Sequence, residues 1–127
     1  MRKSVLIVED EYLIASELAL LLGEHGWQVI GPVGTTSDAL ALLHGELPSV
    51  ALLDLNLGDE LVTPVALALK QEGVPFVLAT AVAQPEQYGG DVFAGILNIG
   101  KTVIKDNLIA TLENLVATTA QSSKIAL

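Results

Sequence analysis

The sequence contains no cysteine, which excludes a disulfide framework, a thiolate zinc site and a cysteine nucleophile. Basic residues are also scarce: 6 Lys and Arg stand against 15 Asp and Glu, for a net charge of -9. Affinity for nucleic acid comes from Lys and Arg neutralising phosphates, so this balance argues against a nucleic-acid partner. Only 4% of the residues are aromatic, which favours a layered interior of Ala, Leu and Val over an aromatic binding cage.

Long hydrophobic runs are missing as well, although 51% of the residues are apolar. The longest segments without Asp, Glu, Lys or Arg, His25–Ser37 and Gly73–Pro85, have 13 residues each and contain Gly and Pro. A membrane-spanning helix needs about 20 apolar residues. The N-terminal apolar run Val5–Val8 ends at Glu9 and is too short for a signal peptide. We therefore expect a cytoplasmic protein with no membrane insertion.

What the sequence does contain is an alternation of two patterns. Short, continuous apolar runs, typical of strands buried on both faces, occur at residues 5–8, 29–33, 50–53, 76–78 and 96–99. Segments with helical spacing lie between them and after the last, at residues 12–25, 37–43, 63–73, 84–93 and from 106 onward. Pro85, Gly89 and Gly90 predict that the fourth helix is short or partly unwound. Thr63 is the expected N-cap of the third helix, with Pro64 at its first position.

This alternation predicts one α/β domain with a doubly wound parallel sheet and helices on both faces. We expect the domain to occupy residues 1–120 and a short polar tail to occupy residues 121–127. Ligands of such folds bind beyond the carboxyl ends of the strands.

Polar side chains follow four of the five expected strands. Glu9 and Asp10 follow the first, Asp54 the third, Thr80 the fourth and Lys101 the fifth. Carboxylates gathered at one edge repel one another unless a cation lies between them, and an all-oxygen site selects Mg²⁺, Mn²⁺ or Ca²⁺. Together with a hydroxyl and a lysine, such a site suits phosphoryl transfer through an aspartyl phosphate. The spacing leaves open which carboxylate is the acceptor.

These segments resemble the receiver domain of response regulators of two-component signalling. The resemblance rests on the run from Val5 to Glu11, the strand ending at Asp54, the run Phe76–Ala81, and Lys101, and it extends from about Lys3 to Val116. It implies a flavodoxin-like (βα)5 sandwich with five parallel strands in the order 2-1-3-4-5.

The resemblance also implies roles for the residues at the strand ends. Asp54 matches the phosphoacceptor, and Glu9 and Asp10 match the acidic pair that holds Mg²⁺, for which Mn²⁺ is a substitute. Asn56 would add its backbone carbonyl to the metal, which Asp54 also contacts. Thr80 and Lys101 match the hydroxyl and the ammonium group that contact the phosphoryl oxygens.

The sequence departs from the family around its last strand. The family's lysine is usually followed by a cis-bonded proline and an aromatic residue, where this chain has Thr102 and Val103. Three residues before Lys101, the family's switch aromatic is replaced by Asn98. Phosphorylation is therefore expected to be intact, and the output face is expected to be atypical.

Each residue also has a structural interpretation. Asp10 is a suitable N-cap for the first helix, and Asp54 for a turn through Gly58. Thr80 is a suitable strand-end hydroxyl, and Lys101 a solvated surface charge. Their joint occurrence at four strand ends favours the functional interpretation.

The leading hypothesis is a stand-alone receiver that accepts a phosphoryl group on Asp54 from a sensor histidine kinase or a histidine phosphotransfer protein, and then switches a protein interaction. A homodimer is compatible with this hypothesis. The alternative is a phosphorylation-independent interaction module with the receiver fold, motivated by Asn98 and the missing proline. An aspartyl-nucleophile phosphatase is rejected, because it needs a general acid two residues after Asp54 and Asn56 stands there. We therefore expect a signalling domain and not an enzyme.

Overall fold

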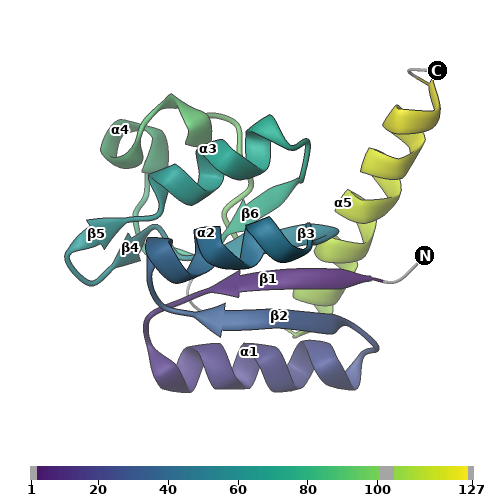
Figure 1. The fold of residues 1–127 in the computed structure, drawn as a ribbon, viewed down its shortest axis with the longest axis horizontal. Helices are drawn as coiled ribbons and strands as arrows, with labels where there is room; N and C mark the ends of the chain where they lie inside the picture. The colour runs from purple at the N-terminus through teal and green to yellow at the C-terminus, as the bar shows by residue number, and fades with distance from the viewer. Residues whose placement is uncertain (1–2, 101–104, 126–127) are drawn as a thin grey trace.

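The computed structural model describes residues 3–100 and 105–125 (Figure 1). Four parallel strands form the main sheet of this part of the chain, in the order β2-β1-β3-β6. They are β1 (Ser4–Val8), β2 (Gln28–Val33), β3 (Val50–Leu53) and β6 (Phe76–Leu78). The order confirms the predicted crossover from the first strand outward to the second and back to the third.

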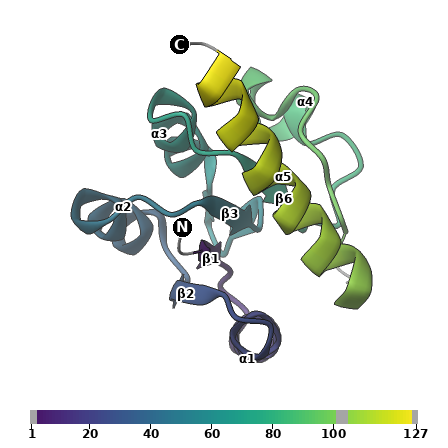
Figure 2. The ribbon, with the colours of Figure 1, turned by 90° about the vertical axis from the view of Figure 1, so that its right-hand side faces the viewer.

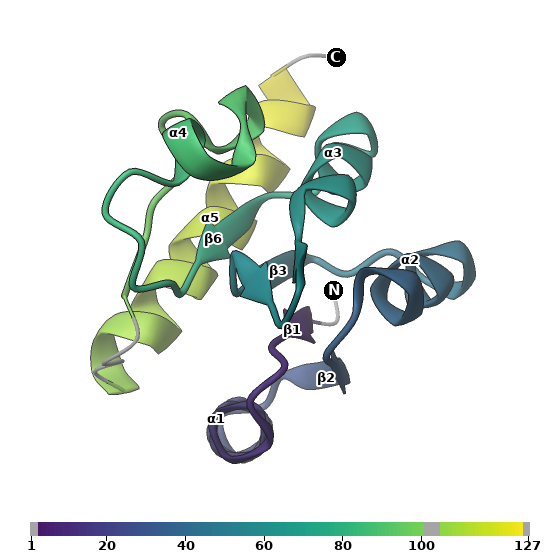
Figure 3. The same ribbon diagram turned by 90° about the vertical axis from the view of Figure 1, so that its left-hand side faces the viewer.

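Helices cover both faces of the sheet (Figures 2 and 3). They are α1 (Tyr12–Glu24), α2 (Thr36–Gly45), α3 (Thr63–Gln71), α4 (Pro85–Gly89) and α5 (Lys105–Ile125). Side chains alternate along β1, so that Leu6 and Val8 pack in the core layer of α2 and α3. Val5 and Ile7 pack in the other layer, with α1 and α5. The continuous apolar strands are thus explained by burial on both faces.

The predicted fifth strand is the main correction to the fold. Within residues 96–100 the structure has a single parallel bridge, between Leu78 and Asn98. The Leu78 N–H donates to Leu97 O at 2.9 Å, and the Ile99 N–H donates to Leu78 O at 2.8 Å. Beyond this point the Asn98 side chain, and not a fifth strand, hydrogen-bonds the backbone of Thr80. The segment lies at the expected edge of the sheet, beside β6, but it is not a regular strand.

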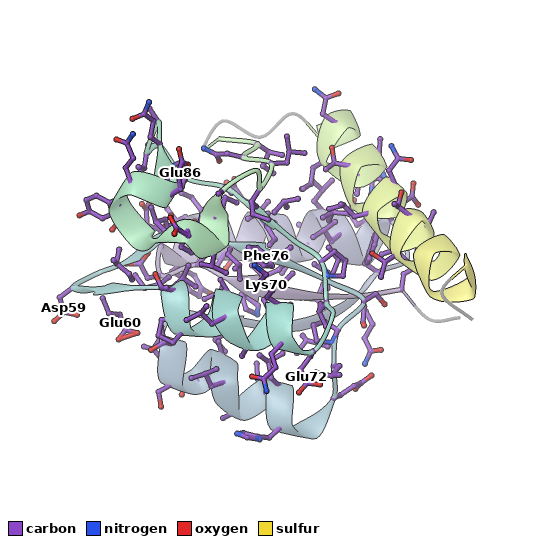
Figure 4. The ribbon with its side chains drawn as sticks, turned by 90° about the horizontal axis from the view of Figure 1, so that it is seen from above. Asp59, Glu60, Lys70, Glu72, Phe76 and Glu86 are labelled. Atoms are coloured by element: carbon purple, nitrogen blue, oxygen red, sulfur yellow. The ribbon has the colours of Figure 1, made fainter. Side chains whose placement is uncertain are left out.

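A small hairpin between β3 and α3 was not predicted. It consists of β4 (Asn56–Leu57) and β5 (Glu60–Leu61), paired antiparallel. Asp59 and Glu60 lie at its tip, which projects from the body of the molecule (Figure 4). The Glu60 carboxylate accepts a hydrogen bond of 2.7 Å from the Thr36 N–H, at the first turn of α2. This bond fastens the hairpin to the start of a helix that is distant in the sequence.

The fourth helix is short and broken, as predicted. α4 ends at Gly89, Gly90 has a φ of +112°, and a 3-10 helix, η1 (Asp91–Phe93), follows. A Cβ on Gly89 would lie 2.8 Å from Leu55 Cδ1 and 2.7 Å from Phe93 Cε2, so a side chain there would displace the packing. The break allows Phe93 to turn into the core, where it is 1% exposed.

Two helix ends differ from the sequence-based expectation. α3 is capped by Val62, and Thr63, its first residue, donates its hydroxyl hydrogen bond to Gly89 O at 2.8 Å. α5 continues through Gln121 to Ile125, so most of the expected tail is helical backbone. The division into a domain at residues 1–120 and a tail stays a prediction. None of the helices in the described ranges is both long enough and apolar enough to cross a membrane.

Candidate functional site

The carboxyl ends of β1 and β3 bring the acidic residues together. The two strands are parallel neighbours with Val8 opposite Leu53, so the residues that follow them leave the sheet side by side. The backbone fixes this junction, because the Asp54 N–H donates to Val8 O and the Glu9 N–H donates to Val33 O, both at 2.9 Å. In Figure 1 the arrowheads of β1 and β2 point to the side of the molecule that carries the hairpin.

Glu9, Asp10 and Asp54 form a carboxylate cluster. One carboxylate oxygen of each lies within 4.8 Å of the others. Glu9 and Asp54 are each 5% exposed, whereas Asp10 is open to solvent. Three carboxylates this close repel one another, and a hard divalent cation with oxygen ligands relieves the repulsion. The donor set is therefore suited to Mg²⁺ or Mn²⁺, and the solvent-facing Asp10 leaves a route for the ion to enter.

Two glycines lie beside Asp10. A Cβ on Gly34, which follows β2, would lie 3.2 Å from Asp10 Cα, closer than most side chains come. Gly58, in the hairpin turn, has a φ of +71°, and a Cβ there would lie 3.9 Å from Asp10 Oδ2. The loop after β2 and the hairpin thus border the carboxylate cluster.

Asn56, the predicted backbone-carbonyl ligand, is the first residue of β4 and is half-buried. It lies two residues beyond Asp54, at the base of the hairpin. Its assignment as a metal ligand stays a prediction.

Thr80 lies at the same edge, after β6. The Ala79 N–H donates to Leu53 O at 2.9 Å, which extends the β3–β6 pairing up to the residue before Thr80. Thr80 is 3% exposed, and its Oγ1 accepts a hydrogen bond of 3.2 Å from the Val82 N–H. The threonine therefore occupies the strand-end position that the sequence predicted.

Lys101, with Thr102 and Val103, lies outside the described residues. The chain is described up to Gly100, whose N–H donates to Asn98 Oδ1 at 3.0 Å.

The role of Asn98 is the feature that sequence reasoning missed. The sequence indicates only that Asn98 replaces an aromatic residue, whereas the structure shows that its amide makes four hydrogen bonds. A signal was present in the run Asn98-Ile99-Gly100, because an asparagine near a glycine often bonds nearby backbone in place of a strand ladder.

Comparison with known proteins supports the geometry. No family model matches the chain. The transcriptional regulatory protein DesR of Bacillus subtilis (strain 168) is 24% identical over 123 residues, which are 96% of this chain and 60% of that protein. The transcriptional regulatory protein PdtaR of Mycobacterium tuberculosis is 32% identical over 84 residues, or 65% of this chain and 40% of that protein. The matches thus span less than two thirds of the length of these curated relatives.

A solved structure agrees over almost its entire length. The signal receiver domain of a modulated diguanylate cyclase from Desulfovibrio desulfuricans G20 has a TM-score of 0.84 and 25% identity, covering 96% of this chain and 99% of that one. The strand order, the residues at the strand ends and the sequence similarity agree: the chain has the receiver-domain fold and is similar in sequence to bacterial response regulators.

Proposed function

We propose that Asp54 accepts a phosphoryl group from the phosphohistidine of a sensor histidine kinase or a histidine phosphotransfer protein, in a Mg²⁺-dependent step in the cytoplasm. The phosphorylated domain then switches a protein interaction through an atypical output face. The observation that carries the proposal is the gathering of Glu9, Asp10 and Asp54 within 4.8 Å at the carboxyl edge of the sheet.

The transfer exchanges one bond to phosphorus for another. An oxygen of the Asp54 carboxylate bonds to phosphorus while the P–N bond of the phosphohistidine breaks. The ring nitrogen keeps the electron pair of that bond and takes a proton from solvent. The Thr80 hydroxyl donates to a phosphoryl oxygen, and the Lys101 ammonium group pairs with another. The domain assists only its own phosphorylation and the later hydrolysis of the aspartyl phosphate. It is therefore a phosphoacceptor domain and not an enzyme that acts on other molecules.

The oxygen donors of this edge fit a resident Mg²⁺, with Mn²⁺ as a substitute. Glu9, Asp10 and Asp54 would hold it through carboxylate oxygens, and Asn56 through its backbone carbonyl. When bound, the ion supplies positive charge beside the phosphoryl oxygens. The chain itself supplies the nucleophile and holds it in a site from which water is largely excluded, since Asp54 is 5% exposed.

An apolar groove beside the cluster supports a protein as the donor. It has a volume of about 700 Å³ and runs between α1 and the end of β2, from Asp10 past Tyr12 and Leu20 to Pro32. Tyr12 is 80% exposed and Leu20 is 66% exposed. Burial of such side chains drives protein association, so a partner seated here would bring its phosphohistidine to the acidic edge.

One observation favours a second candidate, a phosphorylation-independent interaction module. Asn98 takes the place of the switch aromatic, and its amide holds the backbone of Thr80 from both sides. If these hydrogen bonds are the same with and without a phosphoryl group on Asp54, the Thr80 segment does not move and transmits no signal. The two candidates differ in whether Asp54 takes up a phosphoryl group at all.

Intact-mass analysis after incubation with acetyl phosphate and Mg²⁺ tests the proposal. We expect one phosphoryl adduct on the wild-type chain, and none with Asp54→Asn or after chelation of the metal. Asp59→Asn is the matched control, because Asp59 lies exposed in the same β3–α3 connection and has no assigned role. No adduct on the folded wild type, under conditions that label a known receiver, would favour the interaction module.

A further inference from the structure

The Asn98 side chain joins two backbone segments near the proposed phosphoryl site, the turn from Thr80 to Val82 and the residue Gly100. Its Oδ1 accepts hydrogen bonds from the Thr80 N–H at 3.1 Å and the Gly100 N–H at 3.0 Å. Its Nδ2 donates to Thr80 O at 3.1 Å and to Val82 O at 3.4 Å. The amide is half-buried, so water competes with these bonds only in part.

This arrangement replaces a strand with a side chain. In a regular parallel ladder, the N–H and C=O of Thr80 would pair with backbone of the neighbouring strand. Here one amide satisfies both, because it carries an acceptor and two donors on a single planar group. No aromatic side chain carries an acceptor and two donors on one amide group, so Asn98 holds the Thr80 segment in a way that an aromatic residue cannot.

The Thr80 side chain is linked to the same set of contacts. Thr80 Oγ1 accepts from the Val82 N–H, and Val82 O in turn accepts from Asn98 Nδ2. A hydroxyl has one hydrogen to donate besides the lone pairs it offers, so Thr80 accepts from Val82 and keeps its hydrogen for another acceptor. The backbone on both sides of the hydroxyl is thereby tied to Asn98.

We infer that Asn98 is a positioning residue for phosphorylation: its amide holds the Thr80–Val82 turn so that the Thr80 hydroxyl faces the phosphoryl group on Asp54. The inference rests on the proposed function. Donors fixed before the charge arrives stabilise it without reorganising, which is how a remote side chain affects a transfer rate. The same amide also accepts from the Gly100 N–H, so it holds the backbone on its own side of the sheet edge as well as the backbone of Thr80.

The test compares Asn98→Asp with Asn107→Asp. The carboxylate that replaces the Asn98 amide keeps the accepting oxygen, but it has neither donor and it repels Thr80 O and Val82 O. Asn107 is exposed on α5 and undergoes the same chemical change. We expect the initial rate of adduct formation with acetyl phosphate and Mg²⁺ to fall about five- to tenfold in Asn98→Asp, because the misplaced Thr80 hydroxyl loses its single hydrogen bond to the phosphoryl group, worth about 1 kcal/mol or somewhat more. Asn107→Asp should react at the wild-type rate.

A Thr80→Ala background separates positioning from general damage. In Thr80→Ala there is no hydroxyl for Asn98 to position. Adding Asn98→Asp to Thr80→Ala should therefore change the initial rate of adduct formation by less than about twofold. Asn98→Ser, which is too small to span both sides of Thr80, gives a second variant if Asn98→Asp does not fold, as judged by circular dichroism.

The outcomes distinguish the inference from the proposal beneath it. A wild-type chain that takes up no phosphoryl group overturns the proposed function, and the inference with it. If the wild-type chain is labelled and both Asn98→Asp and Asn98→Ser react at the wild-type rate, the inference alone is overturned. The inference is also overturned if Asn98→Asp lowers the rate by the same factor in the wild-type and in the Thr80→Ala background. Asn98 would then act on the fold and not through Thr80.

Discussion

Two neighbouring parts of one sheet edge are built in different ways. At β1 and β3 the ladder is regular up to the last residue, and the carboxylates follow it directly. At β6 the ladder ends in one bridge, and an asparagine amide completes the pairing. We call these the acidic side, which consists of Glu9, Asp10 and Asp54, and the amide side, which consists of Thr80, Val82 and Asn98.

The two sides differ in which hydrogen bonds fix the positions of their residues. On the acidic side, main-chain hydrogen bonds place the site, so any sequence that forms these two strands puts residues 9 and 54 together. On the amide side one side chain does this, so a single substitution can rearrange it. The broken fourth helix follows the same pattern, because α4 has only 5 residues and Phe93, not helix length, anchors the region. The structure therefore predicts that single substitutions alter the backbone of the amide side more easily than that of the acidic side.

The largest expected effect on stability comes from removing the Phe93 anchor. Phe93 is 1% exposed and packs edge-on against Phe76, with ring centroids 6.3 Å apart. Phe93→Ala should lower the free energy of unfolding by about 3–5 kcal/mol, since a buried ring leaves a cavity. Denaturant unfolding measures this loss.

The matched control is Leu67→Ala, because Leu67 is 54% exposed on α3 and should change stability by less than about 0.5 kcal/mol. The comparison of the two sides also predicts that folded Phe93→Ala keeps its metal response. Loss of the stabilisation by Mg²⁺ in folded Phe93→Ala would mean that the acidic side depends on the packing of η1.

The second prediction concerns the acidic side alone. Mg²⁺ at about a hundred times its dissociation constant should stabilise the wild-type chain by about 2.7 kcal/mol, because the ion binds only the folded cluster. Asp10→Asn removes one carboxylate of the cluster and should abolish most of this gain, whereas Asp59→Asn should keep it. Thermal unfolding with and without Mg²⁺ measures both, and an equal gain in Asp10→Asn would place the ion elsewhere.

The sequence is sufficient to predict the acidic side and insufficient for the amide side, for a physical reason. Short, continuous apolar runs predict buried strands, and the carboxyl ends of parallel strands lie at one edge of the sheet. Glu9, Asp10 and Asp54 can therefore be grouped from their places in the chain. The Asn98 amide acts on backbone 18 residues away, and nothing in local pattern indicates which donor it finds. The hairpin was missed because strands of 2 residues have no periodicity. Thr63 was expected to cap α3, but its hydroxyl bonds Gly89 in another segment instead.

The smallest expected effect lies at the hairpin that borders the acidic side. The hydrogen bond from the Thr36 N–H holds the pKa of the Glu60 carboxyl below its usual 4.5. A carboxyl whose pKa is lower in the folded chain binds fewer protons there than in the unfolded chain, so its contribution to stability is complete above about pH 4.5 and is lost as the pH falls through the folded value. Glu60→Gln should remove this part of the acid dependence, while Asp59→Asn, one residue away at the hairpin tip, should leave the contribution of Glu60 in place. Unfolding measured between neutral and acid pH separates the two, and an NMR titration of the Thr36 amide should report the same transition. If the free energy of unfolding falls with acid in the same way in Glu60→Gln and in the wild type, the hydrogen bond to α2 does not stabilise the hairpin, which is then held by its own strand pairing.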